Sequence, residues 1–173
     1  MTTAVLWAVV AYLLGALPSD WVARRVPPAF ATPTHVALDV LKGALAVVWL
    51  PTGGLLAQTL AATAAMAGAQ WPPWGGGGRR RLGVGAGALI VLSPLSVPVW
   101  AVFGGLAYVI TGFPAVGRVV GSVAAPLVVG WWAGWPLGLA CLPICAMQLE
   151  RDREDLRRVL LGTGHRHVWR GDG

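Results

Sequence analysis

The chain has 173 residues, of which 56% are hydrophobic and only 12% are charged, and it carries a net charge of +6. Soluble domains carry about 25% charged residues, so this composition excludes an ordinary soluble globule. The mean hydropathy of +0.66 and the apolar stretches that recur from residue 4 to residue 149 predict an all-α polytopic membrane protein. A transmembrane barrel is disfavoured, because barrel strands alternate apolar and polar residues and stretches such as 4–17 and 123–129 do not.

The first predicted element is an apolar helix over residues 4–23. Arg24 and Arg25 follow this stretch, whereas a signal peptide carries its positive charges before the apolar region. We therefore expect an uncleaved first span whose N-terminus lies outside the cell.

Six more spans are predicted along the chain, each bounded by proline, glycine or charged residues. They cover residues 36–51, 55–70, 83–93, 97–112, 115–132 and 135–149. A charged amphipathic helix is expected from Glu150 to Gly162, with acidic residues near its start and arginines one turn later. This order of charges is that of an ordinary helix at a membrane interface. The chain is thus expected to form one bundle of about seven transmembrane helices over residues 1–149, followed by a short cytoplasmic tail helix and end over residues 150–173.

The thirteen basic residues give the predicted orientation. None of them falls in the predicted outer segments, which are residues 1–3, 52–54, 94–96 and 133–134. Because lysine and arginine accumulate in cytoplasmic loops, we expect the N-terminus outside and the C-terminus inside. The basic residues lie at the ends of apolar runs, where lipid head groups are found, so the basic pI of about 10.7 indicates membrane lipids as partners and not nucleic acid.

The connection before residue 83 is the most favourable stretch for binding an anion. It reads PPWGGGGRRRLG, and a helix N-terminus is expected directly after it. Exposed backbone N–H groups and fixed positive charges can hold a phosphate group there; the residues that supply them are Gly76, Gly77, Gly78, Arg79, Arg80 and Arg81. The alternative is a stop-transfer loop that lies on anionic lipid head groups.

Asp39 and Lys42 are two charges at the start of a long apolar run. Their spacing of three residues places both side chains on one helix face. One interpretation is structural, since an aspartate suits the first turn of a helix and a lysine can extend to the membrane interface. The other is functional, because charges at the membrane edge of a bundle can mark a substrate site.

Neither the cysteines nor the histidines predict a metal site. Cys141 and Cys145 lie one helical turn apart in an apolar run, and no histidine or further cysteine accompanies them, which favours buried packing thiols. His35, His165 and His167 are scattered along the chain. We therefore expect no metal ion and no cofactor.

Three stretches of the chain resemble a known family. AYLLGALPSDWVARR (11–25), LDVLKGALAV (38–47) and DREDLRRVLLGTG (152–164) are similar, in order and expected topology, to the bacterial acyl-phosphate:glycerol-3-phosphate acyltransferase family of the PlsY type. The resemblance implies a multi-pass enzyme of the bacterial cytoplasmic (inner) membrane, with its polar face toward the cytoplasm. Its substrates would be acyl phosphate and glycerol 3-phosphate, and its product, lysophosphatidic acid, would enter phospholipid synthesis.

The family motifs are kept to different degrees. The Gly-Ser-Gly-Asn-x-Gly-Ala-Thr-Asn motif has no counterpart between Arg25 and Asp39, whereas the Asp-Val-Leu-Lys-Gly segment is intact. Residues 68–72, Gly-Ala-Gln-Trp-Pro, correspond to Gly-His-x-Phe-Pro, and Arg81 corresponds to the second lysine of Phe-Lys-Gly-Gly-Lys-Gly. Residues 152–156, Asp-Arg-Glu-Asp-Leu, correspond to His-Arg-Glu-Asn-Ile.

The resemblance also implies roles for individual residues. The glycine–arginine loop would hold acyl phosphate, and the expected catalytic residues are Asp39, Lys42, Arg153, Glu154 and Asp155. Among them, Lys42 and Arg153 would assist with glycerol phosphate, while Asp39 and Glu154 would orient these cations. Because one family motif is missing, the alternative interpretation is that the protein is a catalytically inactive relative that binds a lipid or regulates a partner. A transporter is disfavoured, because the chain shows no inverted repeat and no charge near the middle of a span.

Overall fold

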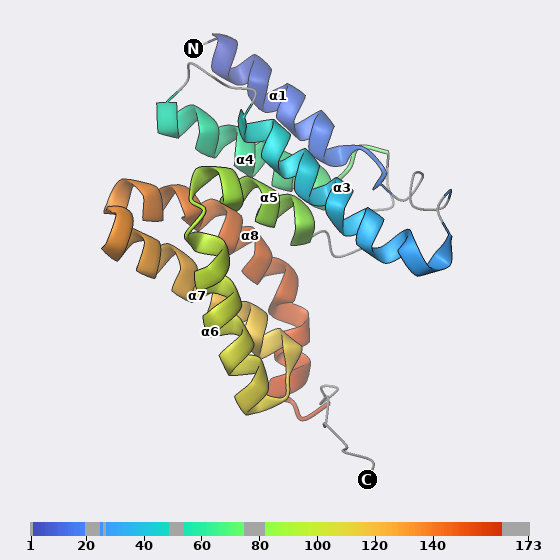
Figure 1. The fold of residues 1–173 in the computed structure, drawn as a ribbon, viewed down its shortest axis with the longest axis vertical. Helices are drawn as coiled ribbons and strands as arrows, with labels where there is room; N and C mark the ends of the chain where they lie inside the picture. The colour runs from blue at the N-terminus through green and yellow to red at the C-terminus, as the bar shows by residue number, and fades with distance from the viewer. Residues whose placement is uncertain (1, 20–24, 26, 49–53, 75–81, 164–173) are drawn as a thin grey trace.

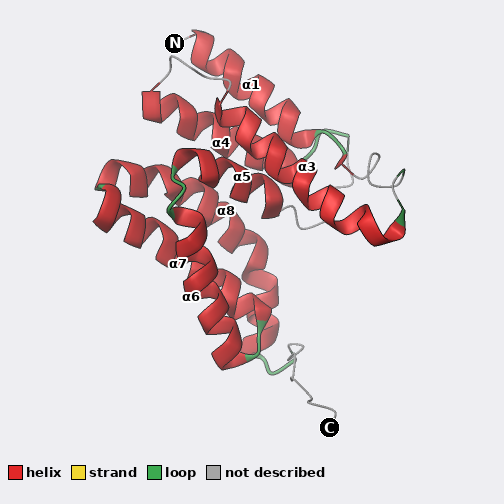
Figure 2. Cartoon of the chain, in the orientation of Figure 1, coloured by secondary structure: helices red, strands yellow, loops and turns green. Residues whose placement is uncertain are grey.

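The computed structural model describes residues 2–19, 25, 27–48, 54–74 and 82–163, and this part of the chain is all-helical (Figures 1 and 2). The described helices are α1 (Thr2–Ala16), α3 (Pro28–Val48), α4 (Gly54–Gln70), α5 (Leu82–Leu92), α6 (Ser96–Thr111), α7 (Pro114–Ala133) and α8 (Trp135–Leu160). The predicted all-α class is confirmed, and a helix occurs in each of the seven predicted positions.

The first two helices have different ends from those predicted. The expected helix over residues 4–23 ends at Ala16, because Pro18 restricts the backbone of Leu17 to non-helical conformations. The second helix begins at Pro28 and not at residue 36. Proline fits the first position of a helix, where its missing N–H would have no intrahelical partner.

The predicted separate tail helix is wrong as an independent element. The segment from Glu150 continues α8, which runs without interruption from Trp135 to Leu160. The arginines, glutamates and leucines of this segment are good helix formers, and the left-handed glycine that follows it, Gly162, lies only beyond its end. One long helix therefore joins the apolar bundle to the charged C-terminal segment.

The helices pack mainly in pairs. The closest pairs are α1 with α4, α3 with α5, α6 with α7, and α7 with α8, while α6 touches α5 only lightly. Figure 1 shows the α6–α7 hairpin extending away from α1 alongside α8. The core between the pairs is made mostly of alanine, valine and leucine, and Cys141 and Cys145 are buried in it as free thiols, as the packing interpretation predicted.

Glycines bring the backbones close together in each of these pairs, and α3–α5 and α1–α4 show it most clearly. A Cβ on Gly87 of α5 would overlap the carbonyl oxygen of Val40 on α3, and one on Gly15 of α1 would overlap that of Ala65 on α4. Close backbone approach through small residues is the usual way that helices associate in membranes.

Within the described part of the chain, one helix, Pro114–Ala133, is long and apolar enough to cross a membrane. Three shorter apolar helices accompany it, covering Val5–Ala16, Gly83–Leu92 and Ser96–Thr111. Length and composition alone therefore give weak support for a membrane-spanning bundle.

Gly87→Ala is expected to lower the thermal unfolding temperature of the protein in detergent, because the added Cβ would force α3 and α5 apart. Overpacking of this kind costs about 1–3 kcal/mol. Gly105→Ala on α6 is the matched control, since a Cβ there meets nothing within 4 Å and alanine favours a helix over glycine. Equal unfolding temperatures for the two variants would contradict the backbone contact between α3 and α5.

Candidate functional site

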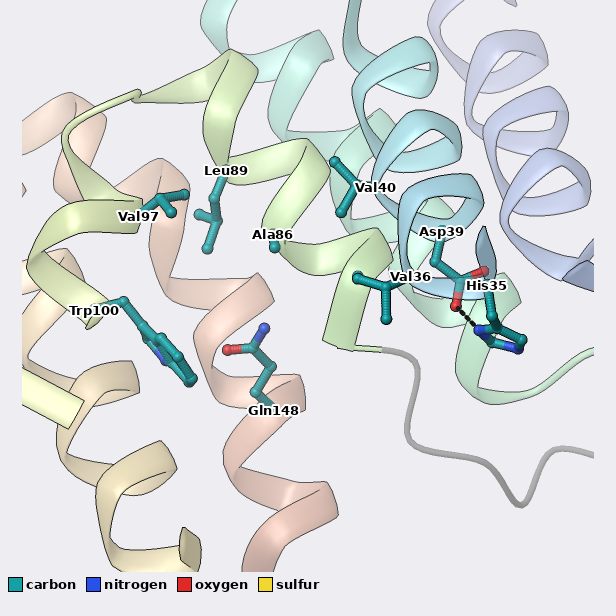
Figure 3. Close-up of a pocket in the computed structure, with 10 residues that line it drawn as sticks. His35, Val36, Asp39, Val40, Ala86, Leu89, Val97, Trp100 and Gln148 are labelled. Atoms are coloured by element: carbon teal, nitrogen blue, oxygen red, sulfur yellow. Dashed lines mark ion pairs between the residues drawn. The ribbon is translucent and has the colours of Figure 1, made fainter. Parts of the chain in front are cut away.

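Asp39 is the centre of a buried polar cluster at the meeting of α1 and α3. Its side chain is only 2% exposed, and its Oδ1 accepts a hydrogen bond of 2.7 Å from the hydroxyl of Ser19. His35 lies one turn earlier on α3, with its Nδ1 3.3 Å from Oδ2 of Asp39 (Figure 3). The other ring nitrogen of His35 lies 3.4 Å from the Ser19 hydroxyl. Buried carboxylates need such partners.

Lys42 connects this cluster to the end of α1. Its Nζ donates a hydrogen bond of 2.7 Å to the carbonyl oxygen of Leu17 and lies 3.5 Å from Oδ1 of Asp39. A lysine that binds a carbonyl at a helix end satisfies one of the groups left without an intrahelical partner. Asp39 and Lys42 therefore share one face and contact each other, and Lys42 also fixes α1 to α3.

A glycine of α5 makes room for the cluster. A Cβ on Gly83 would lie 2.7 Å from the Cβ of Asp39, so a larger residue would push the first turn of α5 away from α3. The described part of α5 begins at Leu82, directly after the glycine–arginine loop. The start of α5 therefore lies beside Asp39. The loop residues Gly76, Gly77, Gly78, Arg79, Arg80 and Arg81 themselves lie outside the described residues.

A cavity of about 390 Å³ lies between α3, α5, α6 and α8 (Figure 3). Its walls are largely apolar, with polar side chains at a few points. The lining residues are His35, Val36, Asp39, Val40, Gly83, Ala86, Leu89, Val97, Trp100 and Gln148. We call this the central cavity. Its volume is within the range of about 300–1,000 Å³ that is typical of small-molecule sites.

A chain of hydrogen bonds fixes the polar side chain on the α8 wall of the central cavity. The indole nitrogen of Trp100 donates to the hydroxyl of Ser122 at 3.2 Å, and this hydroxyl donates to Oε1 of Gln148 at 3.1 Å. Gln148 is 5% exposed and Ser122 is 2% exposed. These two hydrogen bonds connect α6, α7 and α8.

Arg118 of α7 holds the charged segment of α8. Its Nε donates to Oδ1 of Asp152 at 2.8 Å, and its Nη2 donates to Oδ2 of Asp155 at 3.0 Å. Asp152 is buried and Asp155 is half-buried. A guanidinium that binds two carboxylates in this way fixes their positions through its rigid planar geometry.

The other predicted residues of this segment lie at the surface. Arg153 is 81% exposed and lies 4.0 Å from Glu150, and Glu154 lies 4.0 Å from Arg158. Neither Arg153 nor Glu154 lines the central cavity. The structure therefore brings Asp39 and Lys42 together beside the cavity, and it places Asp155 with Arg118 and not with that pair.

Several polar residues of these sites were not singled out from the sequence as site residues. They are Ser19, His35, Arg118, Ser122, Gln148 and Asp152. The spacing of His35 and Asp39, at i and i+4 of one helix, is a signal that could have been found. Ser19 and Arg118 reach their partners from other helices, so no local pattern reveals them. Gln148 is a polar exception in an apolar run.

The chain is similar to a described protein family and to several named relatives. The sequence model of a family described as glycerol-3-phosphate acyltransferase matches residues 22–162. Glycerol-3-phosphate acyltransferase 2 of Moorella thermoacetica is 32% identical over 91% of this chain and 94% of its own length. The glycerol-3-phosphate acyltransferase of Anaeromyxobacter sp. is 33% identical over 76% of this chain and 70% of its own length. That of Parasynechococcus marenigrum is 31% identical over 93% of this chain and 88% of its own length. No solved structure matches the chain significantly.

Arg118→Ala is expected to lower the free energy of unfolding by about 3–5 kcal/mol, because it leaves the buried carboxylate of Asp152 without its cation. Arg158→Ala is the control, since its ion pair with Glu154 is exposed and long and such pairs contribute about 0–1 kcal/mol. Thermal unfolding in detergent measures both variants. If Arg118→Ala unfolded at the same temperature as Arg158→Ala, the two-carboxylate contact of Arg118 would not hold α7 to α8.

Proposed function

Because the chain belongs to the glycerol-3-phosphate acyltransferase family, as its motifs predicted, we propose that it transfers an acyl group from acyl phosphate to glycerol 3-phosphate. The product would be lysophosphatidic acid. The family model covers most of the chain, and relatives named glycerol-3-phosphate acyltransferase match it over nearly their full length.

The central cavity is the observation that carries the proposal. It offers an apolar volume of about 390 Å³ whose walls reach from Asp39 and Gly83 to Leu89 and Val97. At roughly 30 Å³ for a group the size of a water molecule, this volume suits a chain of about a dozen methylene groups. The acyl chain would lie among the apolar residues, and the phosphate would lie near the Asp39 end.

The glycine–arginine loop is the proposed phosphate site. Its sequence ends at the start of α5, and Gly83 of that first turn lines the central cavity. A helix N-terminus and adjacent arginines attract anions. We assign the phosphate of acyl phosphate to this loop, with Arg81 as the counterpart of the family lysine.

The reaction itself needs little covalent assistance from the protein. The hydroxyl oxygen of glycerol 3-phosphate attacks the acyl carbonyl carbon, the bond from that carbon to the bridging phosphate oxygen breaks, and inorganic phosphate leaves. His35 lines the cavity and pairs with Asp39, so it is placed to accept the hydroxyl proton. Positioning of the two anionic substrates supplies the rest.

The roles of the remaining site residues are assigned from the charges of their side chains. Lys42, held between Asp39 and the end of α1, is assigned to the glycerol phosphate. Arg153 is an exposed cation that would meet this substrate at the protein surface, with Glu154 beside it. Asp155 would position the segment through its bond to Arg118.

A catalytically inactive, lipid-binding relative is the second candidate. One observation favours it, namely that the cations of the two clusters already have partners inside the protein. Lys42 binds a backbone carbonyl and Asp39, and Arg118 binds two carboxylates. In this alternative the cavity still holds an acyl chain, but no transfer follows.

We place the protein in the bacterial cytoplasmic membrane as a multi-pass bundle, with its N-terminus outside and its C-terminus inside. Large apolar side chains cover the outer face of α6 and are strongly exposed, among them Val102, Leu106 and Val109. Contiguous apolar surface of this kind needs a lipid or protein neighbour. Trp131 and Trp132 are also exposed near the end of α7, where a belt of aromatic residues would lie at the membrane surface.

The purified protein in detergent, given acyl phosphate and glycerol 3-phosphate, is expected to form lysophosphatidic acid. Lys42→Ala and Arg81→Ala should each lower the rate about 10²–10³-fold, the usual cost of removing one charge-stabilising donor. Arg157→Ala, in the exposed face of α8, is the control and should keep the rate. Absence of product above background in the wild type would favour the inactive relative, and unchanged rates in both variants would refute these two assignments.

The orientation can be tested by cysteine labelling. In a background where Cys141 and Cys145 are replaced by alanine, Ala133→Cys should react with a membrane-impermeant maleimide in intact cells. Thr163→Cys should react only after the membrane is opened. Both positions are exposed, so labelling reports their side of the membrane. Reaction of Thr163→Cys in intact cells would contradict the cytoplasmic C-terminus.

A further inference from the structure

We propose that the amide nitrogen of Gln148 donates a hydrogen bond to the carbonyl oxygen of a fatty acyl phosphate bound in the central cavity. The inference takes the chemical class of its ligand from the proposed function. It assigns the acyl carbonyl to a neutral donor on α8, separate from the charged residues at Asp39 and in the glycine–arginine loop.

The direction of the Gln148 amide follows from its neighbours. The indole N–H of Trp100 can only donate, so the oxygen of Ser122 accepts this hydrogen bond. In the structure, the hydroxyl of Ser122 donates to the oxygen of Gln148, 3.1 Å away. The amide oxygen is thereby used, and the NH₂ group must point the other way. Figure 3 shows the amide oxygen on the Trp100 side and the nitrogen toward α5.

This NH₂ group has no hydrogen-bond acceptor within the part of the chain that the structure describes. Gln148 is only 5% exposed, yet it lines the central cavity. The nitrogen is open to this cavity, since no fully buried side-chain nitrogen or oxygen in the described part of the chain lacks a partner. A ligand that covered this donor without offering an acceptor would lose about 1–3 kcal/mol. An acceptor that arrives with a ligand removes this cost, so the donor is suited to recognition and not only to packing.

Gly85 keeps the space for this donor. A Cβ at position 85 would lie 2.8 Å from the amide nitrogen of Gln148, so any larger residue there would displace the amide. The glycine on α5 and the hydrogen-bonded residues on α6 and α7 therefore act on the two ends of one amide group, Gly85 at its nitrogen and Ser122 at its oxygen. Such support from surrounding residues is what holds a recognition group in place.

An acyl carbonyl is the acceptor that fits this position. The walls around the amide are apolar, with Ala86, Leu89 and Val97 among them, so the group that follows the acceptor must be a hydrocarbon chain. An amide donor matches a neutral carbonyl, whereas a phosphate would favour the arginines. The carbonyl of an acyl phosphate joins the chain to the phosphate and would lie between the two sites.

The test measures the carbonyl directly in the whole protein without turnover. The probe is 2-oxoheptadecylphosphonate, in which a CH₂ group replaces the bridging oxygen of palmitoyl phosphate and the carbonyl carbon is ¹³C. In the wild type, its infrared carbonyl band should shift to lower frequency on binding, because a hydrogen bond weakens the C=O bond. Gln148→Met should return the band to higher frequency and weaken binding about 5–10-fold.

Gln70→Met is the matched control. Gln70 is a second buried glutamine, and its amide nitrogen donates to the carbonyl of Met147, outside the central cavity. Replacing Gln70 should therefore leave the carbonyl band of the bound probe unchanged. If Gln148→Met fails to fold, Ser122→Ala and Gly85→Ala provide the test. Both variants keep Gln148 but disturb its amide, so both should reduce the shift of the carbonyl band.

The outcomes separate this inference from the proposed function. If the wild type and Gln148→Met show the same carbonyl band and bind the probe equally, the inference is overturned even if lysophosphatidic acid is formed. A wild type that does not bind the probe also overturns it. A Gln148-dependent band in a protein without turnover supports the inference while the enzymatic proposal fails. If palmitate bound as tightly as the probe and lost affinity equally in Gln148→Met, the assignment to an acyl phosphate would be overturned.

Discussion

The structure depends on the close backbone contact between α3 and α5. Gly87 lies against the carbonyl of Val40, and Gly83 lies against the side chain of Asp39. Without a Cβ at these places, α5 can approach α3 along its length, and the first turn of α5 comes to lie beside the Asp39 cluster. The same approach brings one wall of the central cavity into position opposite α6 and α8.

The polar groups of the molecule divide into two kinds. Among the described residues, two charged clusters are bonded within the protein: Asp39 with Lys42 and Ser19, and Arg118 with Asp152 and Asp155. These pairs hold α1 to α3 and α7 to α8. The amide of Gln148 differs, because its oxygen is bound and its nitrogen faces an apolar cavity. We infer that the Arg118 pairs build the site, and that Lys42, the neutral donor and the arginine loop recognise the substrates.

The sequence predicted the helices well and the site only in part. Apolar runs bounded by proline and glycine located every described helix, because these breakers act locally. It missed the continuity of α8, since charge alone does not end a helix, and it placed the end of α1 too late although Pro18 signals it. Asp39 and Lys42 were found because their spacing is local to one helix. Ser19, Arg118 and the Trp100–Ser122–Gln148 chain depend on contacts between helices distant in sequence, which no local pattern encodes.

The central claim is that the cavity between α3, α5, α6 and α8 holds an acyl chain with its phosphate at the Asp39 end. Photocrosslinking with an acyl ketophosphonate that carries a diazirine near the end of its chain tests this most directly, with the adducts located by mass spectrometry. The account predicts adducts on Leu89 or Val97, inside the cavity. Adducts confined to the outward side chains of α6, such as Val102 and Val109, would contradict it.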